Sequence, residues 1–378
     1  MMHAGGPSWA WFFEQHVDHR IPIQKLLHLI TLRMFGFDFR VLDGLNVVIA
    51  AMISAAFILS AKAYRGNSNV GDLFIPLSLL SLGSGYTQWG FEFQFLSTIA
   101  FSAAFLLCAA RGATAGAMVS LMLCSWTGLN GVLLSTFIGA ATVGYLVVMR
   151  QQLTRLALAV LIASLLQNIA LWLTWTPSAA SDRHATLPAI AAFVAGMTNG
   201  PMLVYAFQHP WWKIAILGTL IAAGFCCAVV LAIQRKSPKW FLLCASLAAA
   251  MLLTVATAYG RAKEMAWAPG LEMHYGTLAM LMPIIAWIAL STWLPRRAAT
   301  AVGLLLVCLF ARAYWANYQW REAVAANDAG LNDAAASAIA GTAEPASVVS
   351  AHISRYFFID TPRVRQAVTA GISLLRSR

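Results

Sequence analysis

The stretch from Gly112 to Met149 contains no charged residue, and this limits the chain to a few kinds of fold. Its 38 residues would extend roughly 57 Å as one α-helix, nearly twice the roughly 30 Å of a bilayer's hydrocarbon core. The segment must therefore fold back, most simply at the Thr-Gly-Leu-Asn-Gly stretch of residues 127–131. Two membrane spans are predicted here.

The rest of the chain has the same character. Of its 378 residues 60% are hydrophobic and only 10% are charged, whereas soluble domains are about 25% charged. We therefore predict an all-α fold, a polytopic membrane helical bundle of about ten spans. The formal charge of +11 does not indicate nucleic acid as a partner, because no Lys/Arg block with interleaved aromatic residues occurs. Scattered cations between apolar spans are typical of proteins inserted in a membrane, whose orientation they set.

The apolar runs divide the chain into three parts. Residues 1–40 form an amphipathic outer loop, in which residues 24–35 have the spacing of an interfacial helix. Residues 41–316 form the bundle, and residues 317–378 form a small extracytoplasmic tail with helical candidates at 321–339 and 363–375. The predicted spans are 44–61, 73–82, 95–110, two within 112–149, 156–175, 214–233, 240–259, 275–293 and 298–314.

One segment, 176–212, is open to three interpretations, because prolines and glycines interrupt it: a crossing, a re-entrant loop or an interfacial helix. If it does not cross, the cations that flank the spans all fall on one side, which the positive-inside rule makes cytoplasmic. The chain then lies in the cytoplasmic (inner) membrane, with residues 1–40 and the active face extracytoplasmic. Because nothing would carry such an N-terminus across the membrane, we expect a preceding span.

The densest polar cluster lies in the outer loop and contains Glu14, His16, Asp18, His19 and Arg20. The carboxylates and imidazoles can act as acid, base or ligand, and the planar guanidinium can bind a phosphate. Two alternatives remain open: an interfacial helix whose charges are simply solvated, and a zinc site built from the two histidines and the aspartate. The six cysteines all lie in apolar runs and indicate neither a disulfide framework nor a metal site, and the sequence predicts no cofactor.

Two further clusters fall on the same predicted side. In the first, Trp89 can stack on a sugar ring, while Glu92 and Gln94 stand at the start of a span, where a carboxylate is either paired or functional. The alternative is an aromatic-belt turn with the carboxylate at a helix N-terminus. In the second, Arg261 and His274, followed by Tyr275, can bind a phosphate at the membrane surface, and the alternative is an ordinary loop. No nucleotide-binding or hydrolase motif accompanies either cluster.

These clusters together resemble a group of bacterial membrane proteins associated with the GT-C glycosyltransferase superfamily. The strings that carry the resemblance are Asp-His-Arg-Ile-Pro at 18–22, Trp-Gly-Phe-Glu-Phe-Gln-Phe at 89–95, and Gly-Arg at 260–261 followed by His-Tyr at 274–275. Members of the group tend to show Glu-His-Arg-Ile-Pro, Trp-Gly-Phe-Gln-x-Gln-Phe and Gly-Arg followed by Arg-Tyr at these places. Asp18, Glu92 and His274 therefore depart from the pattern.

The resemblance implies a polyprenyl-phosphate-linked sugar donor bound at the outer membrane face, a glycan or lipid acceptor, and membrane lipids as surroundings. It also implies that Asp18 is the acidic catalytic residue, followed by His19 and Arg20, and that Arg261 keeps the later arginine. From the residues themselves we expect Glu14 as a second catalytic carboxylate, and we expect Arg20 and Arg261 to hold the donor phosphate. The expected function is a glycosyltransferase. The alternatives are a carrier or flippase for a lipid-linked or small polar solute, which should bury ionisable residues at mid-span, and a structural membrane protein.

Overall fold

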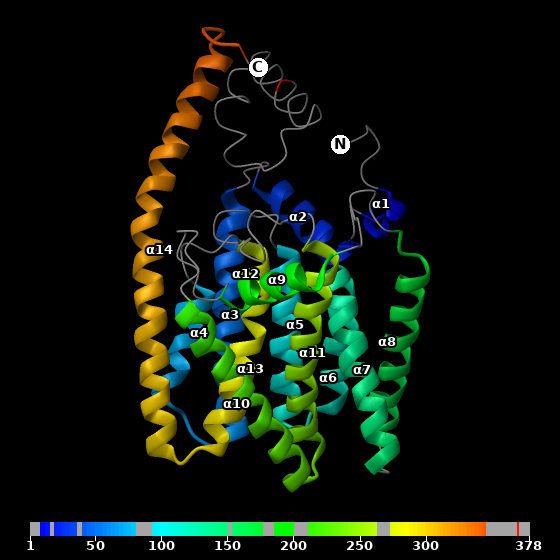
Figure 1. Cartoon of the computed structure of the whole chain (residues 1–378). Helices are drawn as coiled ribbons and strands as arrows, with labels where there is room; N and C mark the ends of the chain where they lie inside the picture. Colours follow the sequence, from blue (N-terminus) through cyan, green and yellow to red (C-terminus); the bar gives the residue numbers. More distant parts are fainter. Residues whose placement is uncertain are drawn as a thin grey trace. The chain divides into compact units, whose positions relative to one another are not determined.

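The computed structural model describes residues 8–15, 19–35, 40–80, 93–149, 153–176, 185–199, 211–262, 273–344 and 369, and every regular element in these ranges is a helix. The chain divides into two compact units, Met1–Asn317 and Tyr318–Arg378. In chain order (Figure 1) the elements are α1 (Trp9–Phe13), α2 (Pro22–Met34), α3 (Arg40–Arg65), the 3-10 turn η1 (Val70–Leu73), α4 (Phe74–Leu79), α5 (Phe93–Ala110), α6 (Thr114–Cys124), the 3-10 turn η4 (Ser125–Thr127), α7 (Leu129–Met149), α8 (Arg155–Leu173), α9 (Leu187–Asn199), α10 (Trp211–Arg235), α11 (Pro238–Arg261), α12 (Met273–Ala279), α13 (Leu281–Trp293) and α14 (Arg296–Ile339).

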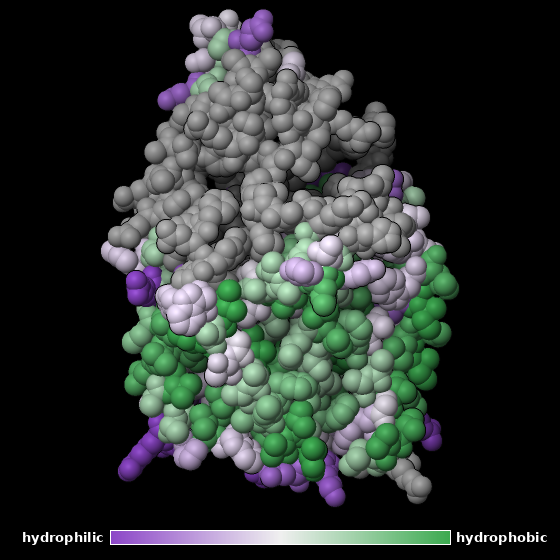
Figure 2. All heavy atoms as spheres, viewed as in Figure 1, coloured by the Kyte–Doolittle hydropathy of each residue, from purple (hydrophilic) through white to green (hydrophobic). Residues whose placement is uncertain are grey.

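Among the described residues, eight helical stretches are long and apolar enough to cross a membrane. They are α3, α5, α7, α8, α10, α11, the α12–α13 pair from Tyr275 to Trp293, and the first part of α14. Their outward side chains form a broad apolar surface, and hydrophilic residues gather at the lower end of the helices in Figure 2. The chain thus has the architecture of a multi-pass helical membrane protein, as its composition predicts.

The predicted count of about ten spans is not reproduced as ten long helices. The apolar run at 73–82 falls partly in the short stretch Val70–Leu79, and the first half of the charge-free segment forms the short stretch Thr114–Thr127. The fold-back itself lies where it was predicted, since Gly128 stands between η4 and α7 with φ = 106°. In the segment 176–212 the structure describes one apolar helix, α9, which with 13 residues is shorter than a membrane span.

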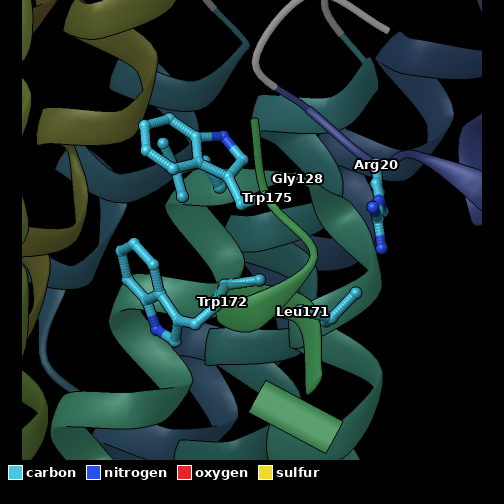
Figure 3. A pocket seen from close by; sticks show the side chains of 7 residues that line it. Arg20, Gly128, Leu171, Trp172 and Trp175 are labelled. Carbon is cyan, nitrogen blue, oxygen red and sulfur yellow. The ribbon is translucent and has the colours of Figure 1, made fainter. Parts of the chain in front are cut away.

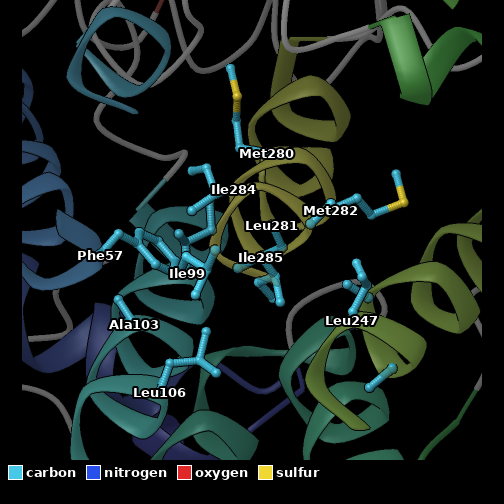
Figure 4. Close-up of a cluster of buried hydrophobic side chains, with 14 of the residues drawn as sticks. Phe57, Ile99, Ala103, Leu106, Leu247, Met280, Leu281, Met282, Ile284 and Ile285 are labelled. Carbon is cyan, nitrogen blue, oxygen red and sulfur yellow. The ribbon is translucent and has the colours of Figure 1, made fainter. Parts of the chain in front are cut away.

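Helix α13 occupies the centre of the bundle. In the span Tyr275–Trp293, which contains α13, 83% of the most apolar part is buried inside the protein, against 28% for α8 and for the first part of α14. Figure 4 shows Ile284 pointing from this region toward Phe57 and Ile99 of the neighbouring helices, and these residues belong to one continuous buried cluster together with Met280, Leu281, Met282 and Ile285. Dispersion and close packing in such a core, rather than charge, hold membrane helices together.

Helix α2 is amphipathic in an unusual sense. Its buried side carries polar Gln24 and Thr31, whereas Leu26, Ile30 and Met34 are 50%, 47% and 72% exposed. Pro22 occupies the first helical turn, where the missing N–H costs nothing. The helix predicted at 24–35 is present as α2, and a helix that turns its apolar side outward is suited to contact lipid.

One end of the bundle collects the cations between spans. Tyr64 donates to the Lys239 carbonyl (3.2 Å) and the Lys239 ammonium donates to the Ala63 carbonyl (2.8 Å), so α3 ends where α11 begins. Tyr145 stacks on Phe241 at 4.4 Å, which brings the end of α7 to the same place. We call this the basic end. The helices that start or finish here carry these cations at their ends: Lys62, Arg65, Arg111, Arg155, Arg235, Lys236, Lys239, Arg296 and Arg297.

A buried ion pair holds the basic end together. Arg65 Nη2 lies 2.6 Å from Asp72 Oδ2 and Arg65 Nη1 lies 3.3 Å from Oδ1, and the two side chains are 6% and 5% exposed. The indole of Trp287 donates to Asp72 Oδ1 (2.9 Å), the backbone N–H of Asn69 donates to Oδ2 (3.2 Å), and Arg65 also donates to Ser291 (2.8 Å). Both carboxylate oxygens of Asp72 therefore accept hydrogen bonds from protein donors, which indicates a role in stabilising the fold.

Candidate functional site

The opposite end of the bundle, which we call the site end, receives the N-terminal segment. Helix α1 begins after Ser8, whose hydroxyl accepts from the Trp11 N–H. Lys25 of α2 donates to the carbonyls of Trp11 (2.6 Å) and Glu14 (2.8 Å) and lies over the Trp11 ring at 5.0 Å. Burial lowers the pKa of Lys25, and the charge of Glu14 partly offsets that effect. The lysine thus joins α1 to α2.

Glu14 itself is exposed, and its backbone carbonyl rather than its carboxylate meets Lys25. The next residue, Gln15, exchanges hydrogen bonds with Thr176: its amide donates to the Thr176 carbonyl, and its Oε1 accepts from the Thr176 N–H at 3.1 Å. The N-terminal segment is therefore attached to the end of α8, at the site end.

His19 packs against the start of α7. Its Nδ1 accepts a hydrogen bond from the Leu129 N–H (3.2 Å), so the neutral ring carries its proton on Nε2. A Cβ added to Gly128 would lie 3.1 Å from that nitrogen, which shows how closely the ring covers the turn. On its other side the imidazole meets Phe95 edge-on, with ring centroids 6.3 Å apart. His19 thus connects α5 with α7.

Arg20 turns toward the end of α8. Its Nη1 donates to the Thr174 hydroxyl and its Nη2 to the Thr174 carbonyl, both at 2.6 Å. Its Nε is buried and has no hydrogen-bond partner among the described residues. A small hollow adjoins the guanidinium, and Figure 3 shows Arg20 on one side of the end of α8 and the two indoles together on the other. Its lining is Arg20, Gly128, Leu129, Val132, Leu171, Trp172 and Trp175.

Phe95, from the string that contains the second predicted cluster, lies beside Tyr275 of the third cluster. Its ring centroid lies 6.4 Å from that of Tyr275, which in turn lies 5.4 Å from Phe193 of α9. Tyr275 is 5% exposed, and Gln94 is 4% exposed with an Oε1 that has no partner among the described residues. His19, Phe95 and Tyr275 therefore form a continuous row of rings, one from each of three strings that are far apart in the sequence.

Arg261 is the last residue of α11 and is half-buried. Because α11 begins at the basic end, its last turn lies at the site end, together with the start of α7 and the end of α8. Helix α11 packs on α7 and α9, whereas Arg20 contacts α8. The two arginines share an end of the bundle and approach it from different helices.

Several predicted site residues lie outside the described residues: His16, Asp18, Trp89 and Glu92. The backbone of His274 belongs to α12, but its side chain also lies outside them. The zinc hypothesis therefore stays untested in two of its three ligands. Among the described residues there is no group of three His, Cys, Asp or Glu side chains that could hold a metal ion.

The residues that sequence reasoning missed are the partners of the N-terminal segment. These partners lie at or just after the end of α8, and none of them was among the predicted site residues: Trp172, Thr174 and Trp175. The fold-back at Gly128 was visible as a turn, but its role as the surface under His19 was not. Comparisons with protein-family models, with curated proteins and with solved structures give no match.

Proposed function

We propose that this chain is a membrane glycosyltransferase that uses a polyprenyl-phosphate-linked sugar donor at the site end of the bundle. One observation supports the proposal: the rings of His19, Phe95 and Tyr275, one from each of three strings that long apolar spans separate, contact one another. A site at the membrane surface that is built from several loops requires such a convergence.

In this proposal Asp18 accepts the proton of the acceptor hydroxyl, and the hydroxyl oxygen forms a bond to the anomeric carbon of the donor sugar. The bond between that carbon and the phosphate oxygen breaks, and the polyprenyl phosphate leaves with one more negative charge than it carried as a diester. Arg20 and Arg261 stabilise the charge that develops there. Gln94, whose buried Oε1 has no partner within the described part of the chain, and Tyr275 line the side on which the acceptor binds.

The location belongs to the same proposal. The site end faces the extracytoplasmic side of the inner membrane, because the basic end carries the cations that the positive-inside rule retains in the cytoplasm. Cysteine scanning in intact cells tests this: Glu14→Cys should react with an impermeant thiol reagent, and Lys236→Cys should react only after permeabilisation, each in a background without the native cysteines. Labelling of both from outside contradicts this orientation.

A carrier for a lipid-linked or small polar solute is the second candidate. It is favoured by two described features, the broken α12–α13 helix and a buried polar group in which Asn168 donates to Ser135 (3.0 Å), which shares a hydrogen bond with Ser125 (2.9 Å). Transporters place discontinuous helices and buried polar groups on a substrate path. Here, however, no buried charge lies at mid-span in the described bundle, which favours the transferase.

The decisive experiment is a glycan profile, by mass spectrometry of envelope lipids and polysaccharides, of a deletion strain complemented at matched membrane abundance. A sugar that disappears on deletion should return with the wild type and with Asp333→Asn, an exposed carboxylate of the second unit. It should stay absent with Asp18→Asn. If Asp18→Asn restores the whole profile, the carrier and the structural function replace the transferase.

A further inference from the structure

Helix α8 turns two polar side chains toward the inside of the bundle. Ser164 and Asn168 stand four residues apart on its buried side, and they are 0% and 1% exposed. The helix packs on α6 and α7 (Figure 1) and on the turn η4, so both side chains lie in the interface with these elements. Because a polar group in a membrane interior is costly unless it is hydrogen-bonded, each of the two requires a partner.

The hydroxyl of Ser164 has no partner among the described residues. A buried serine in a helix commonly donates to the carbonyl four residues earlier, as Ser246 of α11 does to the Leu242 carbonyl (2.7 Å). Within the described part of the chain, the Ser164 hydroxyl is the only fully buried serine or threonine hydroxyl that lacks a partner. Its proton and its lone pairs are therefore both available to a ligand.

The amide of Asn168 is used at its nitrogen and not at its oxygen. Its Nδ2 donates to Ser135 Oγ of α7 (3.0 Å), and Ser135 Oγ also shares a hydrogen bond with Ser125 Oγ of η4 (2.9 Å). The carbonyl oxygen of Asn168 is buried and has no partner in the ranges that the structure describes. An amide oxygen can accept two hydrogen bonds, so this position is suited to a donor.

One water molecule satisfies both groups. It can accept from the Ser164 hydroxyl and donate to the Asn168 carbonyl oxygen, and buried waters typically make about three bonds to such groups. Side chains four residues apart on a helix have Cβ atoms about 5–6 Å apart. A bridging water spans this gap with two hydrogen bonds of about 2.8 Å each.

A cation fits these groups less well than water. Hard cations take roughly six to eight oxygen ligands, among which carboxylates are prominent, whereas α6, η4, α7 and α8 contain no Asp or Glu. A cation also offers no acceptor for the proton of the Ser164 hydroxyl. The chemistry of the two side chains therefore favours a neutral ligand that both donates and accepts.

Close packing encloses this place on one side. A Cβ added to Gly139 of α7 would lie 2.9 Å from Leu165 Cδ2 of α8 and 3.8 Å from Leu121 Cδ2 of α6. Gly139 is four residues from Ser135, on the same face of α7, so the three helices meet next to the polar group. A water held by Ser164 therefore has apolar side chains beside it.

We propose that the interface of α8 with α6 and α7 holds a buried water site, in which an ordered water accepts from Ser164 Oγ–H and donates to Asn168 Oδ1. The water extends the hydrogen-bonded group of Asn168, Ser135 and Ser125, so it stabilises the seating of α8 on α7 and η4. The end of α8 holds Arg20, so the same site supports the helix on which the N-terminal segment rests. The site does not depend on the proposed function, and it accounts for this polar group without a transported solute.

The first test is the sign of the stability change when the Ser164 hydroxyl is removed. The full-length protein is purified in nanodiscs and unfolded by heat, with Ser246→Ala as the matched control, because Ser246 is a buried serine bonded within its own helix. If water satisfies the hydroxyl, Ser164→Ala should lower the unfolding midpoint by about 1–3 °C relative to the control. Without a ligand the substitution removes an unsatisfied buried group, so a midpoint equal to or above that of the control overturns the site.

A double-mutant cycle tests whether the two side chains share the water. The effects of Ser164→Ala and Asn168→Ala should be non-additive, because either substitution already removes one end of the bridge. The effects of Ser246→Ala and Asn168→Ala should be additive, since Ser246 is bonded within α11. Additivity of the first pair overturns the shared water.

Radiolytic labelling in ¹⁸O-labelled water detects the ligand directly, because a hydroxyl radical formed from a buried water oxidises the side chains next to it. The buried leucines Leu121 and Leu161 should be labelled in the wild type, whereas Leu247, buried in α11, should not. The wild-type result decides the case even if Asn168→Ala does not fold, and absence of label at both leucines overturns the site. Stabilisation of the wild type by Na⁺ over choline that Ser164→Ala abolishes overturns water as the ligand.

Discussion

The ion pair of Arg65 and Asp72 allows the sharpest test of the fold. Replacing Asp72 by Asn leaves the shape nearly unchanged and keeps an oxygen for the indole of Trp287, but it leaves the Arg65 cation buried without its counter-charge. Both side chains are at most 6% exposed, so water does not replace the lost partner. Breaking such a pair costs about 3–5 kcal/mol, far above the roughly 0.5 kcal/mol expected at an exposed carboxylate such as Asp333.

The measurement is the thermal unfolding of purified protein in one detergent, followed by near-ultraviolet circular dichroism. Asp72→Asn should unfold at a temperature well below that of the wild type, whereas Asp333→Asn should unfold at the wild-type temperature. Asp72→Ala should be worse, because Trp287 then loses its acceptor as well, which adds about 1–3 kcal/mol. The double variant Arg65→Met with Asp72→Leu should recover most of the loss, since no unpaired charge remains. Equal unfolding of Asp72→Asn and Asp333→Asn refutes the reasoning.

Two further perturbations test the packing and the N-terminal attachment. A Cβ on Gly71 would lie 2.5 Å from the Cα of Gly303 and from Trp287, so Gly71→Ala should destabilise the protein by about 1–3 kcal/mol in the same unfolding assay. The control is Gly44→Ala, which has nothing within 4 Å and should be neutral or stabilising. Equal effects of the two substitutions contradict the predicted contact. Because burial lowers the pKa of Lys25, folding is penalised below that pKa and the penalty disappears as the pH rises through it. Lys25 should therefore react with an amine reagent at lower pH than a free lysine, and a reaction that begins only near the ordinary lysine pKa excludes the burial.

The features that could be predicted from the sequence are those that depend on residues close together in the chain. The charge-free run of 112–149 is too long for one crossing, and the fold-back lies at Gly128, where the backbone takes a φ that glycine adopts readily. The helix at 24–35 was visible from its spacing. The tail candidate at 321–339 was also helical, but it continues α14 rather than forming a short helix.

The rest depended on contacts between distant residues. Nothing near Asp72 in the chain indicates that its indole donor is 215 positions away, and nothing near Arg20 indicates Thr174, 154 positions away. Composition also could not distinguish a full span from the short stretches Val70–Leu79 and Thr114–Thr127, because hydropathy records polarity and not where a helix stops. In the candidate site, the sequence singled out the charged residue Arg20 and missed its neutral partner Thr174.

The outward apolar side of α2 has a practical consequence for purification. Leu26, Ile30 and Met34 are 50%, 47% and 72% exposed, and we expect the bilayer surface to cover these exposed parts in the cell. A detergent micelle curves more strongly than a bilayer and supports this helix less evenly. Helix α2 should then be the first element to open locally, at a free energy well below that of the whole bundle. Since Lys25, on the same helix, contacts the segment that leads to Arg20, loss of the proposed activity on extraction would report the loss of a lipid surface while the helical core is still folded.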